Sequence, residues 1–371
     1  TSQAGMFQLS TTNALLDLNK VFRDPLRVES LQGDINWTWL DSGLLIESSQ
    51  LDAVNSHITT QSRLSVHLPA EGSAFLDLQT NFRDGDGAYT SFYLPYSAMD
   101  EEALAWLDEA IVAGNVDYGS FIFHGAIDDF PFDNNDGRFE VSFKVRDAVL
   151  DYYEDWPVID QIEAEVAFVG RSMHIDASSG KIFGADIRDT VVSIGDLEND
   201  NPLLVIEGSA HTPSKDLFRY IDEAGLAGDF QQALTELDLR GKNDLDLNIK
   251  VPLSKGDVRV KGQLALLDNQ LNIDSWGLQV DNITGLLDFT ENSFDASNIH
   301  ASFNKRDVIV NVATSFPENS ESRTRIRAQS SADIASLIKP KSEGLAMQFS
   351  GDTPFEVLID IPDKSASSLT I

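Results

Sequence analysis

The residues of this chain that could do chemistry are a few histidines and many carboxylates. There are six histidines in 371 residues, and none stands in the H-E-x-x-H pattern that binds zinc on a helix. A scattered histidine is more often structural than a metal ligand, so we expect no metal site. The histidines are His57, His67, His124, His174, His211 and His300.

The carboxylates form clusters, such as Asp128-Asp129 with Asp133 and Asp136. A chain with 60 acidic residues produces such clusters by chance. The segments RDGDG (83–87) and DNNDG (133–137) superficially resemble calcium loops, but neither has the loop spacing with its terminal glutamate. Asp, Asn and Gly favour turns, which is the better explanation of both segments.

Other catalytic motifs are absent from the sequence. It contains no G-x-S-x-G, no P-loop and no dinucleotide fingerprint. With no cysteine, it can form no disulfide, thiol nucleophile or cysteine metal site. We therefore expect a protein that is not an enzyme and has no cofactor.

Composition limits the partners. A formal net charge of −33 argues against binding nucleic acid and against a broad dock onto anionic lipid headgroups. Hydrophobic residues make up 42%, enough to bury a large apolar surface. The sequence has no run of 18 apolar residues and no signal peptide, and it does not begin with Met. We expect it to be an internal fragment of a longer protein.

The element that organises the chain is the stretch 130–169. Apolar residues alternate with polar ones from Phe139 to Val145, which is typical of a strand with one apolar face. A second alternating strand, Ile162–Phe168, follows the pair Trp156-Pro157. The pattern predicts a wide antiparallel sheet whose apolar face must be covered by something.

Similar short strands are expected along most of the chain, including the segments 258–266, 271–273, 278–280 and 286–289. Trp37 and Trp39 lie two residues apart and share one face of such a strand. Three short helices are expected: one from Ser97 as N-cap to Gly114, one beginning near Pro213, and one over about 332–338 before Pro340.

The sequence also contains a repeat. Residues 237–252 align without a gap with 347–362, and the offset of 110 residues brings Gly241 onto Gly351 and Pro252 onto Pro362. A helix is expected before each copy. A short helix followed by several strands, stacked head to tail, is a repeat architecture. We predict an N-terminal β-meander at 1–96, repeats at 97–212 and 213–330, and the start of another at 331–371.

Three segments carry a resemblance to a known family. They are LPYSAMDEEALAWLDEAIVAGNVDYGSFIFHG (94–125), HGAIDDFPFDNNDGRFEVSFKVRDAVLDYYEDWPVIDQIEAEVAFVG (124–170) and GKNDLDLNIKVPL (241–253). In these segments the chain resembles the YhdP family of large AsmA-like periplasmic proteins, relatives of TamB and of the bridge-like lipid-transfer proteins. The pattern continues more weakly over nearly the whole chain.

The resemblance implies a mainly β fold: an elongated, strongly curled antiparallel sheet with a few short helices and an apolar concave face. It also implies a periplasmic segment, anchored in the inner membrane elsewhere in the protein, that carries phospholipids between the inner and outer membranes. The expected partners are phospholipid acyl chains and, through other parts of the protein, both membranes.

Together with the alternation, the resemblance selects candidate groove-lining residues. From periodicity alone, the same residues could equally form an ordinary dry core. The candidates are Phe139, Val141, Phe143, Val145, Ile162, Val166, Phe168, Leu245, Leu247, Ile249, Val251, Val258, Val260, Phe355, Val357, Ile359 and Ile361.

Two other functions stay open. The first is a structural or chaperone-like scaffold for outer-membrane proteins, which would use unpaired strand edges. The second is an acidic extracellular adhesin or calcium-stabilised β-repeat.

Overall fold

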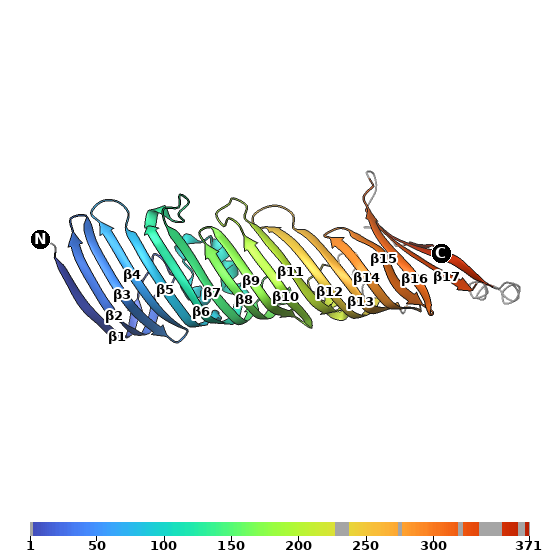
Figure 1. Cartoon of the computed structure of the whole chain (residues 1–371), viewed down its shortest axis with the longest axis horizontal. Helices are drawn as coiled ribbons and strands as arrows, with labels where there is room; N and C mark the ends of the chain where they lie inside the picture. The colour runs from blue at the N-terminus through green and yellow to red at the C-terminus, as the bar shows by residue number, and fades with distance from the viewer. Residues whose placement is uncertain are drawn as a thin grey trace. The chain divides into compact units, whose positions relative to one another are not determined.

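The computed structural model describes residues 3–226, 237–273, 277–317, 322–333, 351–362 and 368–370. The expected fold class is confirmed, because the chain is mainly β with antiparallel pairing and a few short helices (Figure 1). It divides into two compact units. Unit 1 comprises 1–182, 188–205 and 252–255, and unit 2 comprises 183–187, 206–251 and 256–371.

In unit 1 each strand pairs in antiparallel fashion with the next one along the chain, including β5 with β6 across a long connection. Most of β10 (Ala185–Ile194) also belongs here. The preceding strands are β1 (Ala4–Leu16), β2 (Leu26–Leu40), β3 (Gly43–Asn55), β4 (Ile58–Pro69), β5 (Phe75–Asp86), β6 (Ile111–Ala126), β7 (Arg138–Leu150), β8 (Ile159–Val169) and β9 (Ser172–Ile182).

Unit 2 repeats this plan from β12 onward. Most of β11 (Leu203–Pro213) precedes it in the same unit. The paired strands are β12 (Leu237–Pro252), β13 (Arg259–Ile273), β14 (Leu278–Thr290), β15 (Phe294–Phe303), β16 (Arg306–Ser315), β17 (Arg323–Asp333), β18 (Asp352–Pro362) and β19 (Ser368–Thr370).

Among the described residues, the α-helices lie in two connections between strands. The β5–β6 connection holds the 3₁₀ turns η1 (Gly87–Tyr93) and η2 (Tyr96–Ala98) and the helix α1 (Glu101–Ala110). The β11–β12 connection holds α2 (Ser214–Glu223), and a third 3₁₀ turn, η3 (Ile127–Asp129), follows β6.

Both predicted boundaries of the first helix are wrong. Asp100 is the N-cap of α1, since its Oδ1 accepts hydrogen bonds from the amides of Glu102 (2.8 Å) and Ala103 (3.4 Å). Ser97 instead donates its hydroxyl to the carbonyl of Lys20. Gly114 lies inside β6 with φ of 152°, at a bulge where the register with β7 shifts.

Three strand predictions also need correction. Segments 258–266 (apart from Val258, which precedes the strand) and 271–273 are parts of one strand, β13, and 278–280 and 286–289 are parts of β14. Strand β17 was not predicted, and its last two residues, 332–333, begin the segment expected to be helical. The rest of that predicted helix, 334–338, lies outside the described residues.

The predicted repeat gains one supporting feature. Gly241 and Gly351, which the alignment superposes, have φ of 131° and 119°, a backbone region that favours glycine. The repeat and its domain boundaries stay predictions.

Candidate functional site: the apolar face of the sheet

Register places apolar side chains on one face of unit 1. Directly paired residues of an antiparallel sheet lie on the same face, as do residues two apart in one strand. Trp37 pairs with Ile46, which pairs with Val66. Farther along, Phe121 pairs with Val141, and Val141 with Phe168. We call this surface, from β1 to β9, the apolar face of unit 1.

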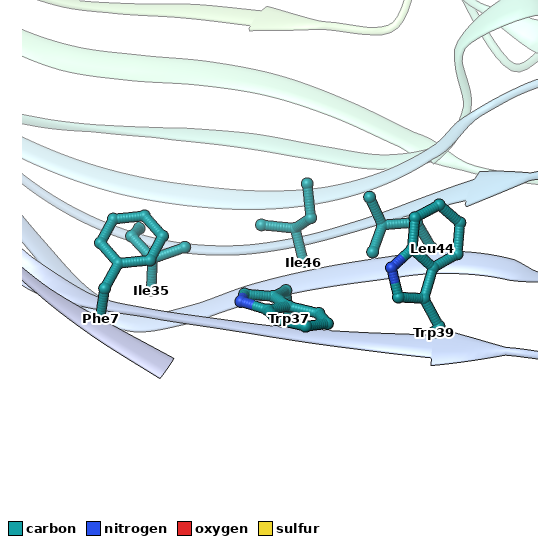
Figure 2. A pocket seen from close by; sticks show the side chains of 6 residues that line it. All are labelled: Phe7, Ile35, Trp37, Trp39, Leu44 and Ile46. Atoms are coloured by element: carbon teal, nitrogen blue, oxygen red, sulfur yellow. The ribbon is translucent and has the colours of Figure 1, made fainter. Parts of the chain in front are cut away.

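The first three strands form a pocket on this face with a volume of about 310 Å³. Figure 2 shows its side chains gathered on the same side of the ribbon. Phe7 and Trp39 are each 50% exposed, so the pocket is accessible from solvent. Trp37 packs over Gly5, its partner across β1 and β2, in the space where a side chain would otherwise stand. The lining residues are Phe7, Ile35, Trp37, Trp39, Leu44 and Ile46.

The candidates on β7 and β8 lie on this same face. Phe143 is paired with Gly119 on one side and Val166 on the other, and its ring lies 6.3 Å from that of Phe82. All seven are partly exposed rather than buried. They are Phe139, Val141, Phe143, Val145, Ile162, Val166 and Phe168.

Phe139 is partly covered by a connection. The β6–β7 connection folds Phe130 onto it, with the ring centroids 5.2 Å apart. Phe132 follows, packs against Phe123 at 5.2 Å and is only 6% exposed. At this end of β6 and β7 the face therefore has a small aromatic core.

The corresponding face of unit 2 contains a buried core. Leu264, Ile283 and Ile299 are each less than 10% exposed and belong to one cluster. Leu217 of α2 packs against this cluster, so the helix covers part of the sheet. Leu245, a predicted lining residue, packs against the same cluster. Near α2, the dry-core alternative therefore describes the face better than an open groove.

The other candidates in unit 2 occupy different positions. Leu247, Ile249 and Val251 on β12 and Val260 on β13 are partly exposed, and Ile249 pairs with Val260. Val258 precedes β13 and is 46% exposed, so it does not line a strand face. The β18 candidates are partly exposed and continue the face through pairs such as Val357 with Ala328. They are Phe355, Val357, Ile359 and Ile361.

Beneath α2, a buried polar network fixes the helix to the sheet. Asn243 and Asn269 are fully buried at bulges of β12 and β13, and Asn269 donates to the Asn243 side-chain oxygen at 2.6 Å. Asn243 in turn donates to the Ser214 hydroxyl at 3.0 Å. Ser214 is the first residue of α2, so these hydrogen bonds join the start of the helix to the sheet.

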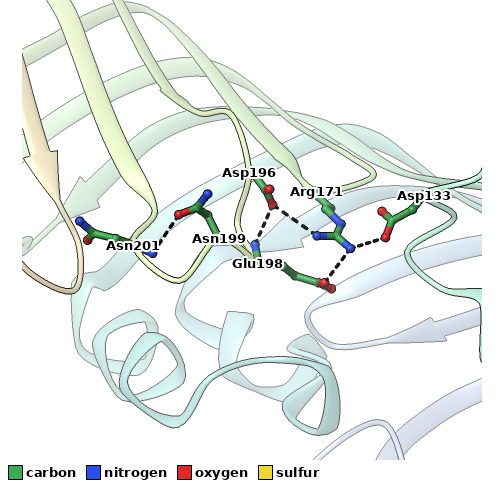
Figure 3. A network of polar contacts seen from close by, with 6 residues as sticks. All are labelled: Asp133, Arg171, Asp196, Glu198, Asn199 and Asn201. Atoms are coloured by element: carbon green, nitrogen blue, oxygen red, sulfur yellow. Dashed lines mark hydrogen bonds and ion pairs between the residues drawn. The ribbon is translucent and has the colours of Figure 1, made fainter.

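Polar contacts also join the loops at one end of unit 1. Arg171, in the β8–β9 turn, pairs with Asp133 from the β6–β7 connection and with Asp196 and Glu198 from the β10–β11 connection (Figure 3). The hydrogen bond to Asp133 is the largest influence raising the pKa of Arg171. Asn201 then accepts from the amides of Ser254 and Lys255 at 3.1 Å. These contacts connect hairpins that are not neighbours in sequence.

The described part of the chain contains no cluster of His, Cys, Asp and Glu suited to a metal ion. Among the same residues, no helix is long and apolar enough to cross a membrane.

The family is decided by comparison with known proteins. The model of the family described as YhdP protein matches residues 1–371. The chain belongs to the YhdP family. A curated relative, the intermembrane phospholipid transporter YhdP of Escherichia coli (strain K12), is 24% identical over 310 residues. That match covers 84% of this chain and 24% of the relative, so the chain spans about a quarter of the relative's length. No solved structure matches.

For this YhdP-family chain, sequence reasoning missed the pocket on β1 to β3. The signal was present, because Trp37 and Trp39 stand two apart in the sequence and share a face. The polar residues Asp34, Asn36 and Thr38 alternate with Ile35, Trp37 and Trp39, so the pattern of a one-sided apolar strand was there to be read. The aromatic residues Phe121 and Phe123 of β6 were missed in the same way.

Proposed function

We propose that this chain is a periplasmic segment of a bridge-like lipid-transfer protein. In this proposal the acyl chains of phospholipids lie along the apolar face of unit 1 while they move between the inner and outer membranes. The full-length protein is anchored in the inner membrane, and both membranes are reached through parts outside this chain. The segment is not an enzyme and does not bind nucleic acid. The E. coli relative, an intermembrane phospholipid transporter, supports the proposal.

The observation that carries the proposal is the partly exposed apolar face with its aromatic pocket. An acyl chain in water costs about 0.8 kcal/mol for each CH₂ left exposed. Side chains such as Trp39, Phe143 and Val166 offer apolar contact without being sealed in a core. The charged headgroup can stay in water beside the sheet, which suits a surface that is strongly acidic elsewhere.

The test is lipid analysis of the protein purified from the periplasm without detergent. Phospholipid should be recovered in stoichiometric amount and should be lost in Phe143→Asp, because a carboxylate in the apolar row repels hydrocarbon. Ile249→Asp tests the open part of unit 2 in the same way. Both variants should retain the β circular dichroism spectrum. Unchanged lipid content in both folded variants would contradict the assignment of these faces.

Tryptophan quenching by brominated phospholipid locates the lipid more closely. Quenching should fall in the double variant Trp37→Phe and Trp39→Phe, which removes the emitters from the pocket. The matched control is Trp106→Phe on α1, outside the apolar face, which should leave the quenching nearly unchanged. Equal loss in both variants would place the lipid elsewhere.

The alternative is a scaffold for outer-membrane protein assembly. That function would use strand edges, and crosslinks to unfolded barrel proteins instead of lipid would favour it.

A further inference from the structure

A corner of unit 1, separate from the residues of the apolar face, exposes aromatic side chains. It consists of α1 and the connection 151–158 between β7 and β8. Trp106 is 47% exposed and Tyr153 is 63% exposed. Neither residue belongs to a strand, so neither contributes to the apolar face of unit 1.

The corner is a well-defined surface, because its parts are bonded to one another. Trp106 donates its indole N–H to the carbonyl oxygen of Tyr152 at 3.0 Å. The amide of Asp151 donates to the carbonyl oxygen of Ala110, the last residue of α1, at 2.8 Å. The ring of Tyr153 packs against Trp156 with the centroids 5.3 Å apart.

The same corner is strongly acidic. No Lys, Arg or His occurs in residues 84–123 or 147–170. One cation reaches the corner from elsewhere, Arg23, which pairs with Asp108 at 2.7 Å. The remaining exposed carboxylates have no ion pair among the described residues. They are Glu101, Glu102, Glu109, Asp151, Glu154 and Asp155.

These two properties together select a partner. Exposed aromatic residues gathered on a soluble surface mark an interaction site. The carboxylates repel anionic lipid headgroups and nucleic-acid phosphates. A guanidinium is attracted both to carboxylates and to the faces of Trp and Tyr rings. We propose that the corner formed by α1 and residues 151–158 is a docking surface for a basic protein segment that carries arginine beside apolar side chains.

In this arrangement Trp106 and Tyr153 supply the faces on which an arginine and its apolar neighbours lie. The carboxylates of Glu102 and Glu154 supply attraction and a salt-dependent association rate. The site does not depend on lipid binding, so an experiment can support or contradict it independently of the proposed function.

The test is calorimetric titration of the full chain with two synthetic peptides. One is an amphipathic peptide of arginine and leucine, and the other is nona-arginine, which has charge alone. The amphipathic peptide should bind at least tenfold more tightly, and its affinity should fall as salt is raised. The double variant Trp106→Ala and Tyr153→Ala should bind it about tenfold more weakly while keeping the β circular dichroism spectrum.

Charge at the corner is tested against charge elsewhere in unit 1. The variant Glu102→Lys with Glu154→Lys should lose binding of the amphipathic peptide. The control Asp34→Lys with Glu47→Lys makes the same change in net charge at exposed positions of β2 and β3 and should lose much less. Equal losses in the two pairs, or unchanged binding without the aromatic residues, would overturn the proposal and leave only general attraction to an acidic protein.

Discussion

The apolar faces of the two units differ in what covers them. In unit 1, Phe7 and Trp39 line a pocket and remain half exposed, and strands β1 to β3 have no helix packed on that pocket. In unit 2, Leu217 of α2 packs against the cluster that contains Leu264 and Ile283, which are almost fully buried. Alternation along a strand determines which face is apolar. Whether that face becomes a lining or a core depends on the connection that folds over it.

The largest expected effect is on the core of unit 2. Leu264→Ala should lower the free energy of unfolding by about 2–5 kcal/mol, because it leaves a cavity under α2. The matched truncation in unit 1, Ile46→Ala, should cost roughly 1 kcal/mol, since that side chain is already partly exposed. Urea denaturation followed by circular dichroism measures both. Similar losses of unfolding free energy in the two variants would mean that α2 does not shield the apolar face of unit 2 from water.

A smaller loss of stability is expected where the aromatic ring of Phe82 packs over a glycine, Gly119. A side chain at Gly119 would lie 2.3 Å from the ring of Phe82 and 2.7 Å from Cβ of Phe143. Gly119→Val should therefore destabilise unit 1 by about 1–3 kcal/mol through overpacking. The control is Gly195→Val, where no atom lies within 4 Å of the new Cβ. If both variants unfold at the same urea concentration, a side chain at position 119 does not overpack against the ring of Phe82, and the prediction is wrong.

The smallest expected effect is on the pH dependence of stability. It compares a carboxylate bonded to a charged side chain with one bonded to neutral side chains. Arg146 lowers the pKa of Asp117 in unit 1, chiefly by hydrogen bonding. Hydrogen bonds from the neutral side chains of Gln279 and Gln270 lower the pKa of Asp281 in unit 2. A pKa below its unfolded value adds stability above about pH 4 that is lost as the pH falls through the folded value.

Both Asp117→Ala and Asp281→Ala should therefore lower the melting temperature at pH 7 and have less effect near pH 3. Added salt should weaken the effect of Asp117→Ala more, because salt screens its charged partner. The same salt dependence for both variants would show that the pairing with Arg146 is unimportant.

Much of the fold was predictable from local pattern. The alternation from Phe139 to Val145 correctly indicated β7, and the turn residues 133–137 correctly indicated a connection before it. The break expected between the strand segments 258–266 and 271–273 is instead a bulge inside β13, where Asp268 has φ of 56°. Alternation of Arg323, Arg325 and Arg327 with smaller residues was a signal for β17 that was overlooked.

The site was less predictable than the fold. Sequence placed Phe143 and Val166 on an apolar face, and register agrees. It could not show that Leu217 of α2 and Leu245 of β12 pack against the same buried cluster, because contacts between separate elements leave no local periodicity. It could not show either that Asn243 and Asn269 are buried, since each stands among polar residues, Lys-Asn-Asp and Asp-Asn-Gln, that resemble an exposed turn.

The pairing of each strand with its predecessor also bears on how the protein is made. Within each unit, the partner of a strand has already left the ribosome when that strand appears. Contacts are therefore short in sequence separation, which favours fast folding for a β protein. Each newly completed edge can serve as the template for the next strand, so folding can keep pace with synthesis. An unfinished chain always presents one open edge, and the time that edge stays unpaired sets its exposure to aggregation.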